Sequence, residues 1–135
     1  MERTATGPTG KAPAAVFKGD VYMTSITVPT PPSRLFASLV RFTPGARTHW
    51  HSHAVGQTLY VTEGVGIVGT RDGGSILIKP GDTVWAPAGE EHWHGATATN
   101  LMCHIAMLEW KEDGSDPTTW LEAVSDGDYR AANQQ

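Results

Sequence analysis

Three histidines at alternate positions, His49, His51 and His53, restrict the possible fold of this chain more than any other feature of its sequence. Successive side chains of an extended strand point to opposite faces, so these imidazoles share one face while Trp50 and Ser52 lie on the other. The same spacing recurs further along the chain in His92 and His94. Neutral imidazole is a common metal ligand, and the alternation therefore predicts a row of metal-binding side chains along one strand.

Both histidine segments stand in a regular frame of glycines and a proline. The first segment follows the pattern G-x5-H-x-H-x3-E-x6-G, with Gln57 in place of the glutamate, at Gly45, His51, His53 and Gly64. The second follows G-x5-P-x-G-x2-H-x3-N, with Ala96 in place of the asparagine, at Gly81, Pro87, Gly89 and His92. The two patterns together resemble the paired signatures of the cupin superfamily.

The resemblance implies an all-β cupin fold, which is a double-stranded β-helix or jelly-roll barrel. Short extended runs separated by Gly- and Pro-rich turns also predict a β-sandwich or barrel. We expect long strands over residues 35–43 and 100–110. The first of these has two largely apolar faces, so it needs cover on both. This predicts a homodimer or homotetramer.

The expected organisation is a flexible N-terminal arm over residues 1–13, a single barrel over residues 14–113 and a C-terminal segment over residues 114–135. That last segment is expected to pack a short helix on the barrel. Asp116 as the N-cap and Pro117 in the first turn predict the start of this helix. Its end is expected near Val124, before the sequence Ser-Asp-Gly.

Composition narrows the classes of function and location. The length of 135 residues suits one domain, and a net charge of −4 without a basic patch argues against nucleic acid as a partner. No apolar run is long enough to span a membrane, and the N-terminus has no signal-peptide pattern. The single cysteine, Cys103, fits a reducing compartment. We therefore expect a cytoplasmic protein that acts on a small molecule.

The cupin resemblance implies one divalent metal ion per chain, held by the residues in the ligand positions of the two patterns: His51, His53, Gln57 and His92. An amide in place of a carboxylate leaves the full charge of the ion available to polarise a bound oxygen, so the site favours Lewis-acid chemistry. By resemblance Mn(II) is the expected ion. Fe(II), Zn(II) and Ni(II) are also compatible with imidazole ligands.

Three further histidines are candidates for the general base. His94 shares a strand face with His92 and is expected inside the barrel. His104 lies on an otherwise apolar face of the strand at residues 100–110, and His49 precedes the ligand pair. Imidazole titrates near neutral pH, as a general base requires. An apolar pocket is expected from residues 39–42 with Leu59, Trp85 and Met102.

Several segments indicate a particular group within the cupins: residues 44–48, 56–59, 80–85 and 92–96, together with Trp120, Tyr129 and Arg130. These resemble the bacterial cupin-type hydroxynitrile lyases. The resemblance implies manganese-dependent cleavage of cyanohydrins with R selectivity, with His94 and His104 in the active site. Two alternatives stay open because one fold supports many reactions. One is a metal-dependent dioxygenase, isomerase or decarboxylase, and the other is a non-catalytic cupin that binds a small molecule.

Overall fold

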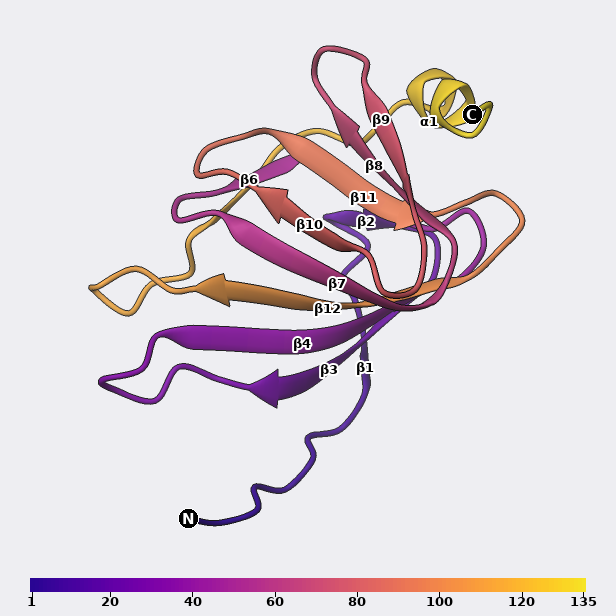
Figure 1. Ribbon diagram of the computed structural model, residues 1–135. Coiled ribbons are helices and arrows are strands. Elements are labelled where there is room, and N and C mark those ends of the chain that lie inside the picture. Colours follow the sequence, from indigo (N-terminus) through magenta and orange to yellow (C-terminus); the bar gives the residue numbers. More distant parts are fainter.

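A computed structural model describes residues 1–135 and shows two β-sheets that face each other (Figure 1). The first sheet has six strands in the order β1 (Gly10–Lys11), β3 (Val21–Thr27), β4 (Leu35–Phe42), β12 (Met102–Glu109), β7 (Gln57–Gly64) and β10 (Thr83–Ala86). Every pairing within it is antiparallel. This confirms the expected all-β jelly-roll barrel.

The second sheet has seven short strands: β2 (Phe17–Lys18), β5 (Arg47–Thr48), β6 (His51–His53), β8 (Gly66–Thr70), β9 (Ser75–Ile78), β11 (His92–Ala96) and β13 (Thr118–Trp120). Strand β11 lies at its centre, because it pairs with β5, β6 and β8. The outer members are β13, which pairs with β6, and β9, which pairs with β8. The two histidine segments are therefore neighbours in one sheet.

Two apolar clusters pack on opposite faces of this second sheet. The larger one fills the space between the sheets and contains fully buried side chains such as Phe42, Leu59 and Met102. The smaller one contains Trp50, which immediately precedes β6, and Trp93, which lies between two histidines of β11. Because side chains alternate along a strand, the imidazoles point into the barrel and both indoles point out.

The outward indoles are covered by the C-terminal tail and its only helix, α1 (Asp126–Ala132) (Figure 1). The hydroxyl of Tyr129 donates to the backbone oxygen of Ala96 over 2.8 Å, and the Arg47 guanidinium lies 4.1 Å from the centre of the Tyr129 ring. Arg47 also donates to Val124 O and to the Asp126 carboxylate. The tail is thus tied to β5 and β11, the strands next to the histidines.

The position expected for this helix was wrong. Residues expected to be helical form β13 instead, in which Thr118 pairs with His53 and Trp120 with His51. The Asp116 carboxylate accepts from Thr118 N, a local turn that competes with helix capping. The helix starts later, at Ser125, whose side chain accepts from Asp128 N. The serine that was expected to stop a helix is therefore the N-cap of one.

The outer face of the first sheet is unusually apolar for a surface. Strand registry places these side chains on that face: Tyr22, Leu39, Tyr60, Trp85, Ile105 and Met107. Trp85 is 60% exposed, and Tyr60 is 41% exposed. Residues Thr4–Thr6 line a surface hollow on this side together with Leu39 and Ile105. No helix of the structure has the length and apolar character needed to cross a membrane.

We predict that a second copy of the chain covers this outer face, since contiguous exposed apolar area on a sheet is typical of an interface. Light scattering of the wild-type protein should give a dimer or tetramer mass. Changing Ile105→Lys places a charge on the face and should shift the mass toward the monomer. The matched change Ile76→Lys, on the exposed side of β9, should leave the mass unchanged. A monomeric wild-type protein would contradict the prediction.

Candidate metal centre

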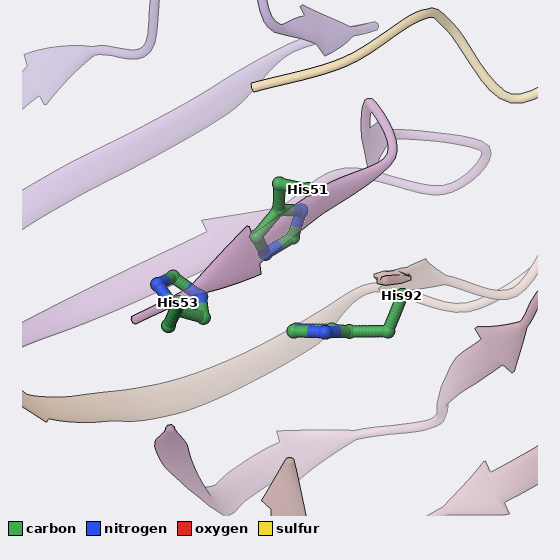
Figure 2. Close-up of side chains that lie close together, drawn as sticks. All are labelled: His51, His53 and His92. Carbon is green, nitrogen blue, oxygen red and sulfur yellow. The ribbon is translucent and has the colours of Figure 1, made fainter. Parts of the chain in front are cut away.

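Three buried histidines from two adjacent strands converge inside the barrel. Figure 2 shows the rings of His51 and His53, from β6, facing His92, from β11. His51 and His92 are directly paired across the strands, and their ring centroids are 4.4 Å apart. The potential ligand atoms of the three residues all lie within 4.8 Å of one another. The cluster is compact enough to share one ion after small side-chain movements.

Hydrogen bonds on the far side of each ring orient these imidazoles. His51 Nδ1 donates to His49 O over 2.9 Å, and His92 Nδ1 donates to Glu90 O over the same distance. A carbonyl oxygen accepts only, so the proton of each neutral ring is on Nδ1 and Nε2 keeps its lone pair. His53 Nδ1 is bonded to Thr118 Oγ1 at 3.0 Å. Partners of this kind orient the histidine ligands of metals in proteins.

The unpaired atoms of the cluster are those that a metal ion needs. His53 Nε2, His92 Nε2 and Gln57 Oε1 are buried and have no hydrogen-bond partner. Gln57 comes from the start of β7 in the opposite sheet and is 4% exposed. Buried polar atoms without partners are costly and rare, so a group that binds all of them is expected. The donor set fits a divalent cation.

Burial keeps the cluster histidines neutral. Loss of solvent lowers the pKa of His53 to about 4, with a further decrease from nearby His92 and an opposing increase from the Gln57 amide and Asp116. The pKa of His51 falls well below its ordinary value, and that of His92 is also lowered, in both cases mainly through burial. Near neutral pH these rings are uncharged, which is the form that binds metal.

A second histidine pair lies beside the cluster. His94 is on the inner face of β11, and His104 is on β12 in the other sheet; His94 Nδ1 and His104 Nε2 are 3.0 Å apart and share a hydrogen bond. Burial lowers the pKa of His94 well below its ordinary value and that of His104 to about 4. The free nitrogens, His94 Nε2 and His104 Nδ1, are buried without partners. Both residues line the central cavity.

His49 is not part of this arrangement. It lies between β5 and β6, is half-buried and does not line the cavity. Its backbone N–H donates to Val16 O, and its carbonyl oxygen accepts from His51. The His49 backbone therefore orients a cluster imidazole, while the side chain is outside the cavity.

The cluster opens on a cavity of about 160 Å³, smaller than the ~300–1,000 Å³ of typical drug-sized ligand sites. Its apolar lining consists of Phe17, Met23, Phe36, Val40, Ala106, Leu108, Trp110 and Trp120. Its polar lining consists of Ser38, Thr48, His51, His53, Gln57, His94, His104, Asp116 and Thr118. No lysine or arginine lines it. A small and largely uncharged molecule fits these walls.

The apolar pocket differs from the one expected. Val40 lines the cavity, but Leu59 and Met102 are buried in the core and Trp85 lies on the outer face of the first sheet. Thr118 of β13 lines the cavity although the sequence analysis did not single it out, and Trp120, expected on a helix, lines it from the same strand. Two adjacent β-branched threonines at residues 118 and 119 favour a strand, and this signal would have indicated β13.

Comparison with known proteins agrees with this geometry. The cupin domain family matches residues 38–108 of the chain. A protein from Granulicella tundricola named (R)-mandelonitrile lyase is 43% identical over 131 residues, which cover 96% of this chain and 98% of that protein. The chain therefore belongs to the cupin family.

Two solved structures extend the comparison. A cupin-like protein from Thermotoga maritima has a TM-score of 0.86 and 33% identity, with 99% of this chain and 98% of the other covered. A predicted oxalate decarboxylase from Thermotoga maritima has a TM-score of 0.67 and 20% identity, covering 75% of this chain and 90% of the other. The second likeness concerns the fold alone. Within the family, this protein is a cupin whose His51, His53 and His92 cluster is suited to hold a metal ion.

We predict that metal affinity depends on the hydroxyl that orients His53. Thr118→Val removes the hydroxyl, keeps the branched shape, and should weaken metal binding about tenfold, as loss of such orienting partners typically does. Titration with metal and elemental analysis measure the change. Thr119→Val, at the exposed neighbouring position, is the matched control and should bind as the wild type does. An unchanged affinity in Thr118→Val would argue that this hydrogen bond does not support a ligand.

We also predict that the metal-free protein loses stability as pH falls from 6.5 toward 4. In the folded state the pKa of His104 is about 4, against an ordinary value of 6.5, so between these values the unfolded chain binds a proton that the folded chain does not. Stability from this residue is complete above pH 6.5 and decreases by about 2 kcal/mol at pH 5. Urea unfolding at pH 7 and pH 5 measures it. His104→Gln should reduce the difference, and an equal difference in both proteins would contradict the assignment.

Proposed function

We propose that this cupin is a metal-dependent lyase that cleaves cyanohydrins to an aldehyde and hydrogen cyanide with R selectivity. The observation that carries the proposal is the pair of neutral, hydrogen-bonded histidines that line the same small cavity as His51 and His53 of the cluster. The full-length relative named (R)-mandelonitrile lyase, at 43% identity, supports the reaction class.

The side chains around the cavity provide no partner for an additional negative charge on the substrate. The cavity lining contains neither lysine nor arginine, and its one carboxylate, Asp116, is at an exposed position. A dicarboxylate would have the proposed metal ion as its only cationic partner, because no lysine or arginine lines the cavity to pair with its second carboxylate. A cyanohydrin carries no charge and meets no such penalty. This favours a cyanohydrin over a dicarboxylate as the substrate.

The ligand set would consist of the three cluster histidines and Gln57, whose oxygen is buried without a partner and whose amide lies close enough to His53 to raise its pKa. A divalent ion bound there supplies a Lewis acid for the substrate oxygen, and the neutral amide leaves its charge undiminished. We propose Mn(II), because an amide oxygen is a harder donor than imidazole. Side chains of the protein would hold the organic group of the substrate and move its hydroxyl proton.

The linked histidines provide a base and an acid together. If His94 Nδ1 carries the proton of the shared hydrogen bond, His94 Nε2 is bare and His104 Nδ1 carries the remaining proton. If His104 Nε2 carries it, the assignments reverse. In either arrangement one free nitrogen is a base and the other is an N–H donor, because each neutral imidazole has one proton. Burial supports this neutral state by lowering both pKa values.

Cleavage then needs one proton to move twice. The bare nitrogen of the pair accepts the hydroxyl proton, while the electron pair of the carbon–cyanide bond leaves with the cyanide as the carbonyl forms. The protonated imidazole returns this proton to the cyanide, giving hydrogen cyanide and restoring the neutral pair. The side chains of Val40, Ala106 and Leu108 provide an apolar wall for the organic group.

The test is an assay of the metal-loaded protein with racemic mandelonitrile, following benzaldehyde release and the remaining enantiomers. We predict release that requires metal and consumes the R enantiomer. His94→Ala should lower kcat by about 10²- to 10⁴-fold, the usual contribution of a general acid or base, while metal content stays at one per chain. His49→Ala is the matched control, since that side chain lies outside the cavity.

Other outcomes separate the alternatives. Benzaldehyde release that persists with chelator present would exclude the metal from the reaction. Oxygen uptake with a flavonol or diketone, without cyanohydrin cleavage, would favour a dioxygenase. Saturable binding of small molecules without turnover of any of them would favour a binding protein.

A further inference from the structure

One cavity hydroxyl has no part in the arrangement described above. Ser38, in the middle of β4, is 2% exposed, and its Oγ has no hydrogen-bond partner in the protein. Removing a hydroxyl from water without giving it a partner is unfavourable, and native proteins rarely leave such a group unpaired. Ser38 also lines the cavity. Its missing partner is therefore expected to be a molecule that enters the cavity.

The other cavity hydroxyls already have partners. Thr48 Oγ1 accepts from His94 N at 3.1 Å, and Thr118 Oγ1 is bonded to His53 Nδ1. Both therefore belong to the frame that holds the histidines. Ser38 is the one serine or threonine of the lining whose hydroxyl is uncommitted. This sets it apart as a group available to a ligand.

Registry places Ser38 beside the organic group of a bound substrate. Across β12, Val40 is paired with His104 and Ser38 with Ala106, so Ser38 lies one strand repeat, about 7 Å, from the level of the histidine pair. In the other direction Phe36 stacks on Trp110, with ring centroids 6.1 Å apart, and both rings are half-buried. The hydroxyl thus lies between the proton-transfer pair and the more exposed end of the cavity.

We propose that Ser38 Oγ binds a polar substituent on the carbon skeleton of the substrate, remote from the carbon that reacts. This inference rests on the proposed lyase function and specifies its substrate class. The preferred substrate is an aryl cyanohydrin whose ring carries a hydroxyl or alkoxy group, in place of an unsubstituted one. The walls around Ser38, formed by Val40 and Ala106, accept the ring, and the serine accepts or donates one hydrogen bond.

Binding of unreactive alcohols tests this without turnover. Calorimetry of the metal-loaded protein compares benzyl alcohol with its ortho, meta and para hydroxy derivatives. At least one derivative should bind roughly two- to tenfold more tightly than benzyl alcohol, the range given by one neutral hydrogen bond. In Ser38→Ala this preference should fall to about one. Ser25→Ala, an exposed serine on the neighbouring β3, should keep it.

Two results would overturn the proposal. The first is a wild-type protein that binds all four alcohols equally. The second is a Ser38→Ala variant that keeps the preference. Equal loss of affinity for all four alcohols would be one form of this result, and it would indicate that Ser38 has a purely structural role or recognises a group common to all of them. The mandelonitrile assay is independent of this ratio. Absence of turnover with an intact ratio would reject the lyase reaction and leave the Ser38 contact standing.

Discussion

The alternation of side chains along β6 and β11 is the constraint on which the rest of the structure depends. A tryptophan stands next to the histidines of each strand. The face that carries the indoles must therefore be covered by apolar groups outside the barrel, and the opposite face, which carries the imidazoles, must line the interior. The direct pairing of His51 with His92 then sets the distance between the two rows. A shift of one residue in either strand would place indoles in the cavity and imidazoles under α1.

Burial gives the site its chemistry as well as its shape. The same loss of solvent lowers the pKa of every histidine in the cavity, and each neutral ring then has one nitrogen for a ligand and one for a partner. Backbone carbonyls orient His51 and His92 from outside the cavity. Burial is thus the common reason why the three-histidine cluster can bind a cation and why the linked His94 and His104 can accept a proton.

Much of the fold and the cluster could be predicted from local sequence. The two-residue period of the histidines and the spacing of glycines around them are short-range patterns, and β4 and β12 form close to where their apolar runs predict. The C-terminal segment was harder. Asp116–Pro117 begins a helix in many chains, but here Thr118–Trp120 gains a strand partner in β6, and pairing outweighs a local capping preference.

Strand parity could be predicted from local sequence within one strand, because it is a property of the backbone alone. Parity therefore predicted that His51 points with His53 and that His94 points with His92, while the resemblance to the cupin patterns implied that His51, His53 and His92 are ligands. Parity failed for His49, which lies between β5 and β6 and does not line the cavity. Only the tertiary structure decided which distant residues meet them. The bond from His94 to His104, the support of His53 by Thr118 and the isolation of Ser38 all join separate strands, and such contacts depend on how the two sheets are registered and packed.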